Sequence, residues 1–112
     1  MLSKLKIIHD VLSNVLPGSV FHYEAMNVED KYVVWAEDSE GSSVEGDDRK
    51  INQSIQGTID YFTKEDMDEN VDKIQDALTA SCISFYLNSV QYEPADEGGT
   101  SVIHFEWVWE VA

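Results

Sequence analysis

The chain has 112 residues, and its 22 acidic and 7 basic residues give it a formal charge of −15. This length predicts one domain, residues 1–112, that can bury a core without disulfide staples, and a 43% apolar composition supports a packed fold. Because so negative a surface repels phosphate backbones and anionic headgroups, direct binding to nucleic acid or to a membrane is excluded as the expected function.

The first half of the chain predicts one helix, two strands and a loop. Apolar side chains recur at helical spacing over 2–16, and a Pro-Gly pair follows at once, which predicts an amphipathic helix. The β-rich stretches 20–25 and 31–37 predict strands. Residues 38–50 contain seven charged side chains and two glycines, which predicts a long acidic surface loop.

The middle of the chain predicts a half-buried strand and then a helix. Apolar and polar residues alternate over 51–62, the period of a strand. Asp66 and Glu69 have the spacing of a capping box, so we expect the helix to begin there. Its buried stripe is expected to contain Met67, Val71, Ile74 and Leu78.

Two strands are predicted at the end of the chain, over 83–92 and 101–111, with Pro94 and a Gly-Gly pair in the hairpin loop between them. In the last strand Trp107 and Trp109 share the apolar face, so we expect both in the core. The order is α-β-β-β-α-β-β. We predict an α+β domain with a mixed, mostly antiparallel sheet and two helices on one face.

The residue patterns predict no enzyme, metal site or cofactor. A calcium loop beginning at Asp66 would place Val71 where glycine is needed and Ala77 where glutamate is needed. The three histidines lie in different elements, although His104 falls on a polar face with Glu106. No nucleophile motif or phosphate-cradling glycine loop is present. The acidic surface leaves weak, nonspecific cation binding open.

The single cysteine, Cys82, is expected to be a buried, inert thiol at the start of a strand. No apolar run is long enough to cross a membrane, and the N-terminal segment lacks the pattern of a signal peptide. We therefore expect the protein to be cytosolic when made.

The chain resembles the tail-terminator (tail-completion) proteins of long-tailed bacteriophages and their prophages over nearly its whole length. The resemblance rests on the opening helix that ends in Pro-Gly, on KYVVWAE with its polar loop, on IQGTIDYFTKEDMDENVDKIQDAL, and on the closing strand VIHFEWVWEV. It implies a non-enzymatic structural protein of the virion, at the head-proximal end of the tail. Such a protein stops polymerisation of the tail tube and provides the surface that joins the head.

The resemblance also implies a ring of six copies, with the tail tube protein and the head–tail connector proteins as partners, through which DNA passes without specific binding. Candidate contacts to neighbouring subunits or partners lie in and beside the acidic loop: Lys31, Asp38, Glu40, Glu45, Asp47, Asp48, Arg49 and Lys50. Ring closure must overcome repulsion between the copies, so we expect salt to strengthen the assembly.

An acidic DNA mimic that inhibits a nucleic-acid-binding enzyme is the alternative function. Such a protein arranges carboxylates at phosphate-like spacing in a contiguous stripe. Here the acids are spread over loops, a helix face and strand faces, which weakens this alternative. Titration against a DNA-cleaving enzyme at low salt tests it, because a mimic would inhibit the enzyme.

Overall fold

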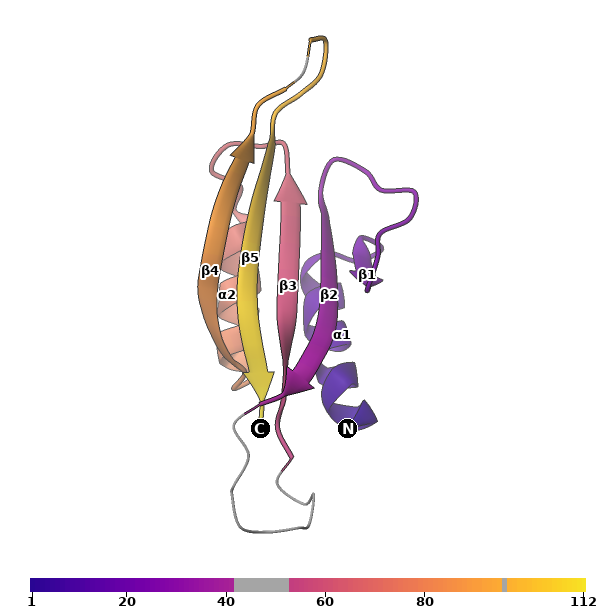
Figure 1. Ribbon diagram of the computed structural model, residues 1–112, viewed down its shortest axis with the longest axis vertical. Helices are drawn as coiled ribbons and strands as arrows, with labels where there is room; N and C mark the ends of the chain where they lie inside the picture. The colour runs from indigo at the N-terminus through magenta and orange to yellow at the C-terminus, as the bar shows by residue number, and fades with distance from the viewer. Residues whose placement is uncertain (42–52, 96) are drawn as a thin grey trace.

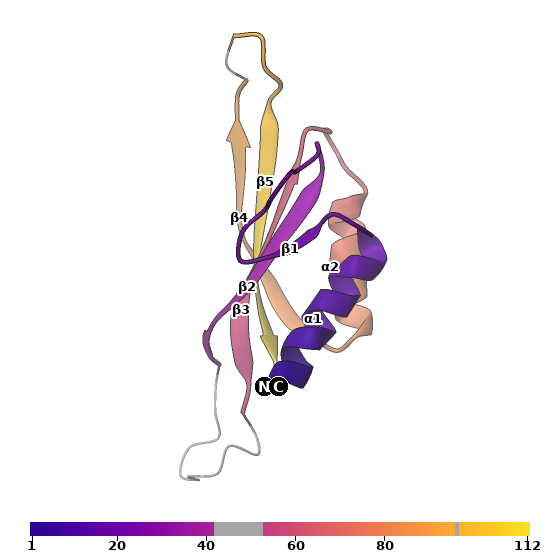
Figure 2. The same ribbon diagram turned by 90° about the vertical axis from the view of Figure 1, so that its right-hand side faces the viewer.

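The computed structural model describes residues 1–41, 53–95 and 97–112, and it confirms the predicted element order. Two helices lie on one face of a five-stranded sheet (Figures 1 and 2). The elements are α1 (Leu2–Val15), β1 (Val20–His22), β2 (Tyr32–Glu40), β3 (Ile55–Thr63), α2 (Asn70–Ala80), β4 (Ser84–Glu93) and β5 (Val102–Val111). Neither helix is long and apolar enough to span a membrane.

The strand order in the sheet is β1-β2-β3-β5-β4, so the last strand of the chain lies inside the sheet and β4 forms one edge. β1 runs parallel to β2, and the other neighbouring pairs are antiparallel. In β3 every second residue from Ile55 to Thr63 is buried, which confirms the predicted alternation. The sheet is therefore mixed and mostly antiparallel, as predicted.

The core lies between the helices and the sheet face that they cover. Trp107 and Trp109 of β5 are buried there, as their alternation predicted. The Trp107 indole Nε1 donates a hydrogen bond to the Gln75 side chain of α2 at 2.9 Å, and that of Trp109 donates to the Thr58 carbonyl at 2.9 Å. Both polar ring atoms are thus satisfied inside an apolar layer.

Gly57 allows the central strands to come together around Trp109. A Cβ atom at this position would lie 2.0 Å from the Ala36 carbonyl oxygen and 2.6 Å from the Trp109 ring. The first of these neighbours is backbone and cannot move aside cheaply. Only glycine fits at this position of β3, between β2 and β5.

The predicted start of the second helix is wrong. α2 begins at Asn70 rather than at the Asp66–Glu69 pair, and Met67, expected in the buried stripe, is 91% exposed. The neighbouring Asp68 is buried. Its carboxylate accepts hydrogen bonds from the Tyr61 hydroxyl (2.5 Å), the Thr63 hydroxyl (2.7 Å) and the Asn70 N–H (2.9 Å). The bonds from Tyr61 and Thr63 tie Asp68 to β3, so α2 begins about one turn later than the capping box predicted.

The Asp68 network shifts the pKa values of its members. Burial raises the pKa of Asp68, but the hydrogen bonds from Tyr61, Asn70 and Thr63 outweigh it and hold that pKa below its ordinary value. Burial, with the hydrogen bond to Asp68, raises the pKa of Tyr61 to about 12. The network therefore contains an ionised carboxylate and a neutral phenol at neutral pH.

The expectation of a buried Cys82 is also wrong. This residue is exposed, with φ at 57°, in the turn that ends α2. The Cys82 N–H donates to the Thr79 carbonyl and the Ile83 N–H to the Leu78 carbonyl, the pattern of a Schellman motif. Cysteine takes the left-handed position that glycine usually fills, which turns its side chain away from the core.

The predicted loop over 38–50 begins later than expected. β2 continues to Glu40, because Ser39 and Glu40 pair with Gln56 and Ile55 of β3 after a register shift beyond Glu37. Pairing with β3 thus overrides the polar composition of this segment. Residues 42–52 and 96 are outside the described part of the chain.

Candidate subunit interface

The outer edge of β4 offers an exposed strand to a partner. β4 pairs with β5 on one side and ends the sheet on the other, so half of its backbone hydrogen-bonding groups point outward (Figure 1). Four large apolar or aromatic side chains on it are exposed, Tyr86 (58%), Leu87 (45%), Val90 (51%) and Tyr92 (63%). We call this strand with these four side chains the β4 edge. Long exposed edges of this kind are templates for pairing with another chain.

The β4 edge lies in the longest charge-free part of a strongly charged sequence. Residues 77–92 contain no acidic or basic side chain, although 22 acidic and 7 basic residues are spread over the rest. Soluble proteins usually protect an exposed edge with charges or prolines, and this strand has neither before Glu93. Its one irregularity is a register shift between Leu87 and Ser89. Apart from that bulge, the edge lacks the usual protection, which makes it a candidate surface for a partner.

The opposite edge of the sheet is incomplete. β1 pairs with Val33, Val34 and Trp35 of β2. From Ala36 to Ser39, no further strand of the described residues lies on that side of β2. The sheet therefore has two different edges that can accept a strand, one neutral and one next to acidic side chains.

The short β1 is held on β2 by a polar and aromatic cluster that sequence reasoning missed. The Glu37 carboxylate accepts the Tyr23 hydroxyl at 2.6 Å and lies 2.7 Å from His22 Nε2, and the His22 ring stacks on Trp35 at 3.9 Å. Burial raises the pKa of Glu37, but the bonds from Tyr23 and His22 outweigh it and leave that pKa lowered. Sequence patterns did not reveal this cluster, because Tyr23 and His22 are 14 and 15 residues away from Glu37 along the chain.

Of the predicted contact residues, the structure describes Lys31, Asp38 and Glu40, and it places Lys31 apart from the other two. Asp38 and Glu40 are exposed together at the end of β2, where Asp38 accepts a hydrogen bond from the Ser39 hydroxyl at 2.8 Å. Lys31 lies before the start of β2, and its ammonium contacts Glu65 at 3.2 Å and Asp68 at 3.5 Å. The hydrogen bond to Glu65 raises the pKa of Lys31. This lysine is therefore engaged within its own subunit.

The remaining predicted contacts, Glu45, Asp47, Asp48, Arg49 and Lys50, lie outside the described residues. They stay predictions.

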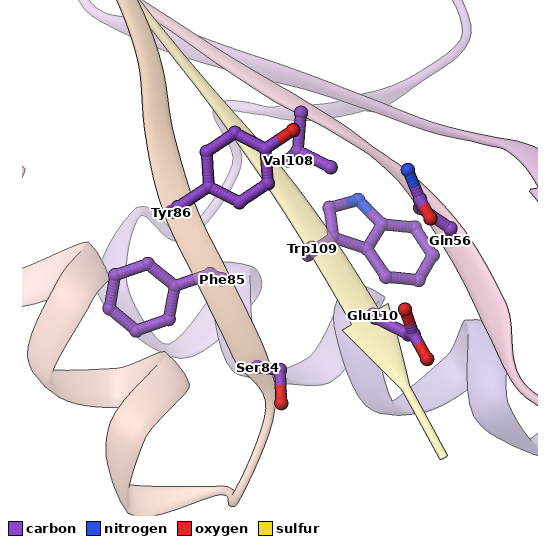
Figure 3. A pocket seen from close by; sticks show the side chains of 7 residues that line it. All are labelled: Gln56, Ser84, Phe85, Tyr86, Val108, Trp109 and Glu110. Atoms are coloured by element: carbon purple, nitrogen blue, oxygen red, sulfur yellow. The ribbon is translucent and has the colours of Figure 1, made fainter. Parts of the chain in front are cut away.

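A shallow hollow of about 160 Å³ adjoins the β4 edge. Figure 3 shows that Tyr86 lies beside Val108 while Phe85 points away from it, and that Gln56 and Glu110 lie around Trp109. Ser84 completes the lining. Pockets for small-molecule ligands are larger, roughly 300–1,000 Å³. The hollow suits a side chain of a docked partner better than a substrate.

The comparisons with known proteins give a distant structural likeness and no family match. No protein-family model matches the chain, and no curated protein matches it. Among solved structures, a chain described as "Virion of native gene transfer agent (GTA) particle" is similar over 93% of this chain and 90% of that chain. The identity is 10% and the TM-score 0.46, and at these values the likeness carries no argument about function.

Proposed function

We propose that this protein is a structural subunit of a phage-like virion, a tail terminator that forms a ring at the head-proximal end of the tail tube. In this role it stops tube polymerisation and presents the surface for the head–tail connector proteins. The observation that carries the proposal is the β4 edge, an exposed strand with four large apolar or aromatic side chains and no charge before Glu93, in a chain of charge −15. The sequence resemblance supplies the type of assembly and the number of copies, six.

Charge explains why the β4 edge is the surface for self-association. Six copies at −15 each carry a formal charge of −90. Two like charges brought to 4 Å at a protein surface repel by about 4 kcal/mol. A contact made through residues 77–92 brings no charge of its own to the interface, so it avoids part of this repulsion.

The two unlike edges favour a ring over a symmetric dimer. If the β4 edge of one copy pairs beside Ala36–Ser39 of the next, the contact is head-to-tail, and such contacts close into rings when the rotation allows. Asp38 would then lie at the interface, as the sequence predicted. Backbone hydrogen bonds would supply the affinity, and the apolar side chains of β4 would supply the buried area.

The remaining acidic surface suits a channel for DNA. A lumen lined by carboxylates repels phosphate, so DNA slides through without being bound. The same charge distribution disfavours a monomeric DNA mimic, because its acids form no single stripe in the sequence.

The test is tail-tube polymerisation. Tube protein from the same phage is assembled with and without this chain, and tube lengths are measured by electron microscopy. We expect the chain to stop elongation and to label one end of each tube. Unchanged lengths with no end-bound protein, over a range of salt concentrations, would contradict the proposal. Inhibition of a DNA-cleaving enzyme at low salt would support the DNA-mimic alternative instead.

A further inference from the structure

Three side chains with metal-binding atoms meet on the sheet face that the helices leave open. Asp60 of β3 lies directly opposite Glu106 of β5, and His104 is two residues from Glu106 on the same face. His104 Nε2 lies 2.6 Å from the Asp60 carboxylate. One imidazole nitrogen and two carboxylate oxygens all lie within 4.8 Å of one another. Asp60 and His104 are 44 residues apart in sequence, which is why spacing alone predicted no metal site.

Two carboxylates face each other in this cluster, and His104 is the ion-pair partner of one of them, Asp60. Like charges directly opposite each other in neighbouring strands destabilise a sheet, and here both carboxylates are half-buried. Among the described residues, no lysine or arginine forms an ion pair with Asp60 or Glu106. A divalent cation between the two carboxylates would remove the repulsion.

Neighbouring side chains hold two of the three groups in place. The Phe62 ring stacks on the His104 ring with centroids 4.3 Å apart. The Asn88 amide of β4 donates a hydrogen bond to Glu106 at 2.7 Å. Groups that orient ligands in this way are a regular part of metal sites. The three candidate ligands themselves stand on strands rather than loops, which favours precise geometry.

We propose that Asp60, His104 and Glu106 bind one divalent transition-metal ion, with Zn²⁺ as the best match. The imidazole ligand selects against Mg²⁺ and Ca²⁺, which prefer oxygen alone. Zinc with three protein ligands leaves a fourth position for water or for a donor from another molecule. This site is independent of the proposed ring.

The test uses the full chain, stripped of metal with a chelator and titrated with Zn²⁺ by calorimetry and by native mass spectrometry. We expect one bound ion per chain. His104→Gln and Asp60→Asn should each weaken binding tenfold or more, since each removes a ligand. His22→Gln is the matched control, because His22 also lies 2.7 Å from a carboxylate, that of Glu37, but forms no three-ligand cluster with other described residues. It should leave zinc affinity unchanged.

Equal affinity in the wild type and His104→Gln would overturn the site. So would several weak sites that vanish at about 0.5 M salt, because screening at that ionic strength removes diffuse binding to an acidic surface. If His104→Gln fails to fold, Co²⁺ spectra of the wild type and Glu106→Gln decide. We expect visible absorption bands that change in Glu106→Gln, and identical bands in the two proteins would overturn the proposal.

Discussion

The buried Asp68 carboxylate joins β3 to the start of α2 through three hydrogen bonds. Asp68→Ala should lower the free energy of unfolding by about 3 kcal/mol, because the buried Tyr61 and Thr63 hydroxyls lose a charged acceptor. Urea unfolding at pH 7 measures this. Asp66→Ala is the matched control, since Asp66 is exposed and starts no helix, and its effect should stay within about 0.5 kcal/mol. Equal losses in both variants would contradict the network.

The lowered pKa of Asp68 gives this network a pH dependence of known sign. A group whose pKa is lowered by folding stabilises the fold at pH values above its ordinary pKa, here 3.8. That contribution is lost as the pH falls through the pKa of the folded state. The difference in stability between the wild type and Asp68→Asn should therefore shrink as the pH drops below about 3.8. A difference that stays constant down to pH 2 would show that the charge of Asp68 contributes nothing.

At the scale of single elements, the end of α2 contains strain that glycine would relieve. Cys82 occupies a left-handed conformation at the position where helices favour glycine. Cys82→Gly should raise stability by about 1 kcal/mol, because the left-handed cost to a residue with a Cβ exceeds the extra entropy that glycine loses. Thermal unfolding under reducing conditions measures the gain. Cys82→Ala keeps a Cβ and should show none, so an equal gain in both variants would assign the effect to the thiol.

The elements that the sequence predicted well are those fixed by periodicity. Alternation in β3 and β5 identified the buried face, because a one-residue slip would expose Trp107 and Trp109. The start of α2 was missed, because local capping by Asp66 competed with hydrogen bonds from Tyr61 and Thr63, which no spacing rule connects to Asp68. The exposed Cys82 was missed for the same kind of reason, since a Schellman turn needs no glycine in the sequence.

At the scale of the whole molecule, the candidate interface follows from strand order rather than from composition. A hairpin of β4 and β5 can join a sheet through either strand, and alternation does not distinguish the two. The structure places β5 beside β3, which leaves β4, with its four exposed apolar or aromatic side chains, at the edge. The acidic and basic residues predicted as contacts were chosen by charge, whereas the candidate interface has no charged side chain before Glu93.

The most direct test of this account is native mass spectrometry of the wild type and two variants over a range of protein and salt concentrations. Val90→Glu adds a charge to the β4 edge, and Met67→Glu adds the same charge at the 91% exposed side chain before α2. We predict a hexamer that strengthens with salt in the wild type and in Met67→Glu, and is lost in Val90→Glu. The same oligomer distribution in all three proteins would contradict the β4 edge as the subunit interface.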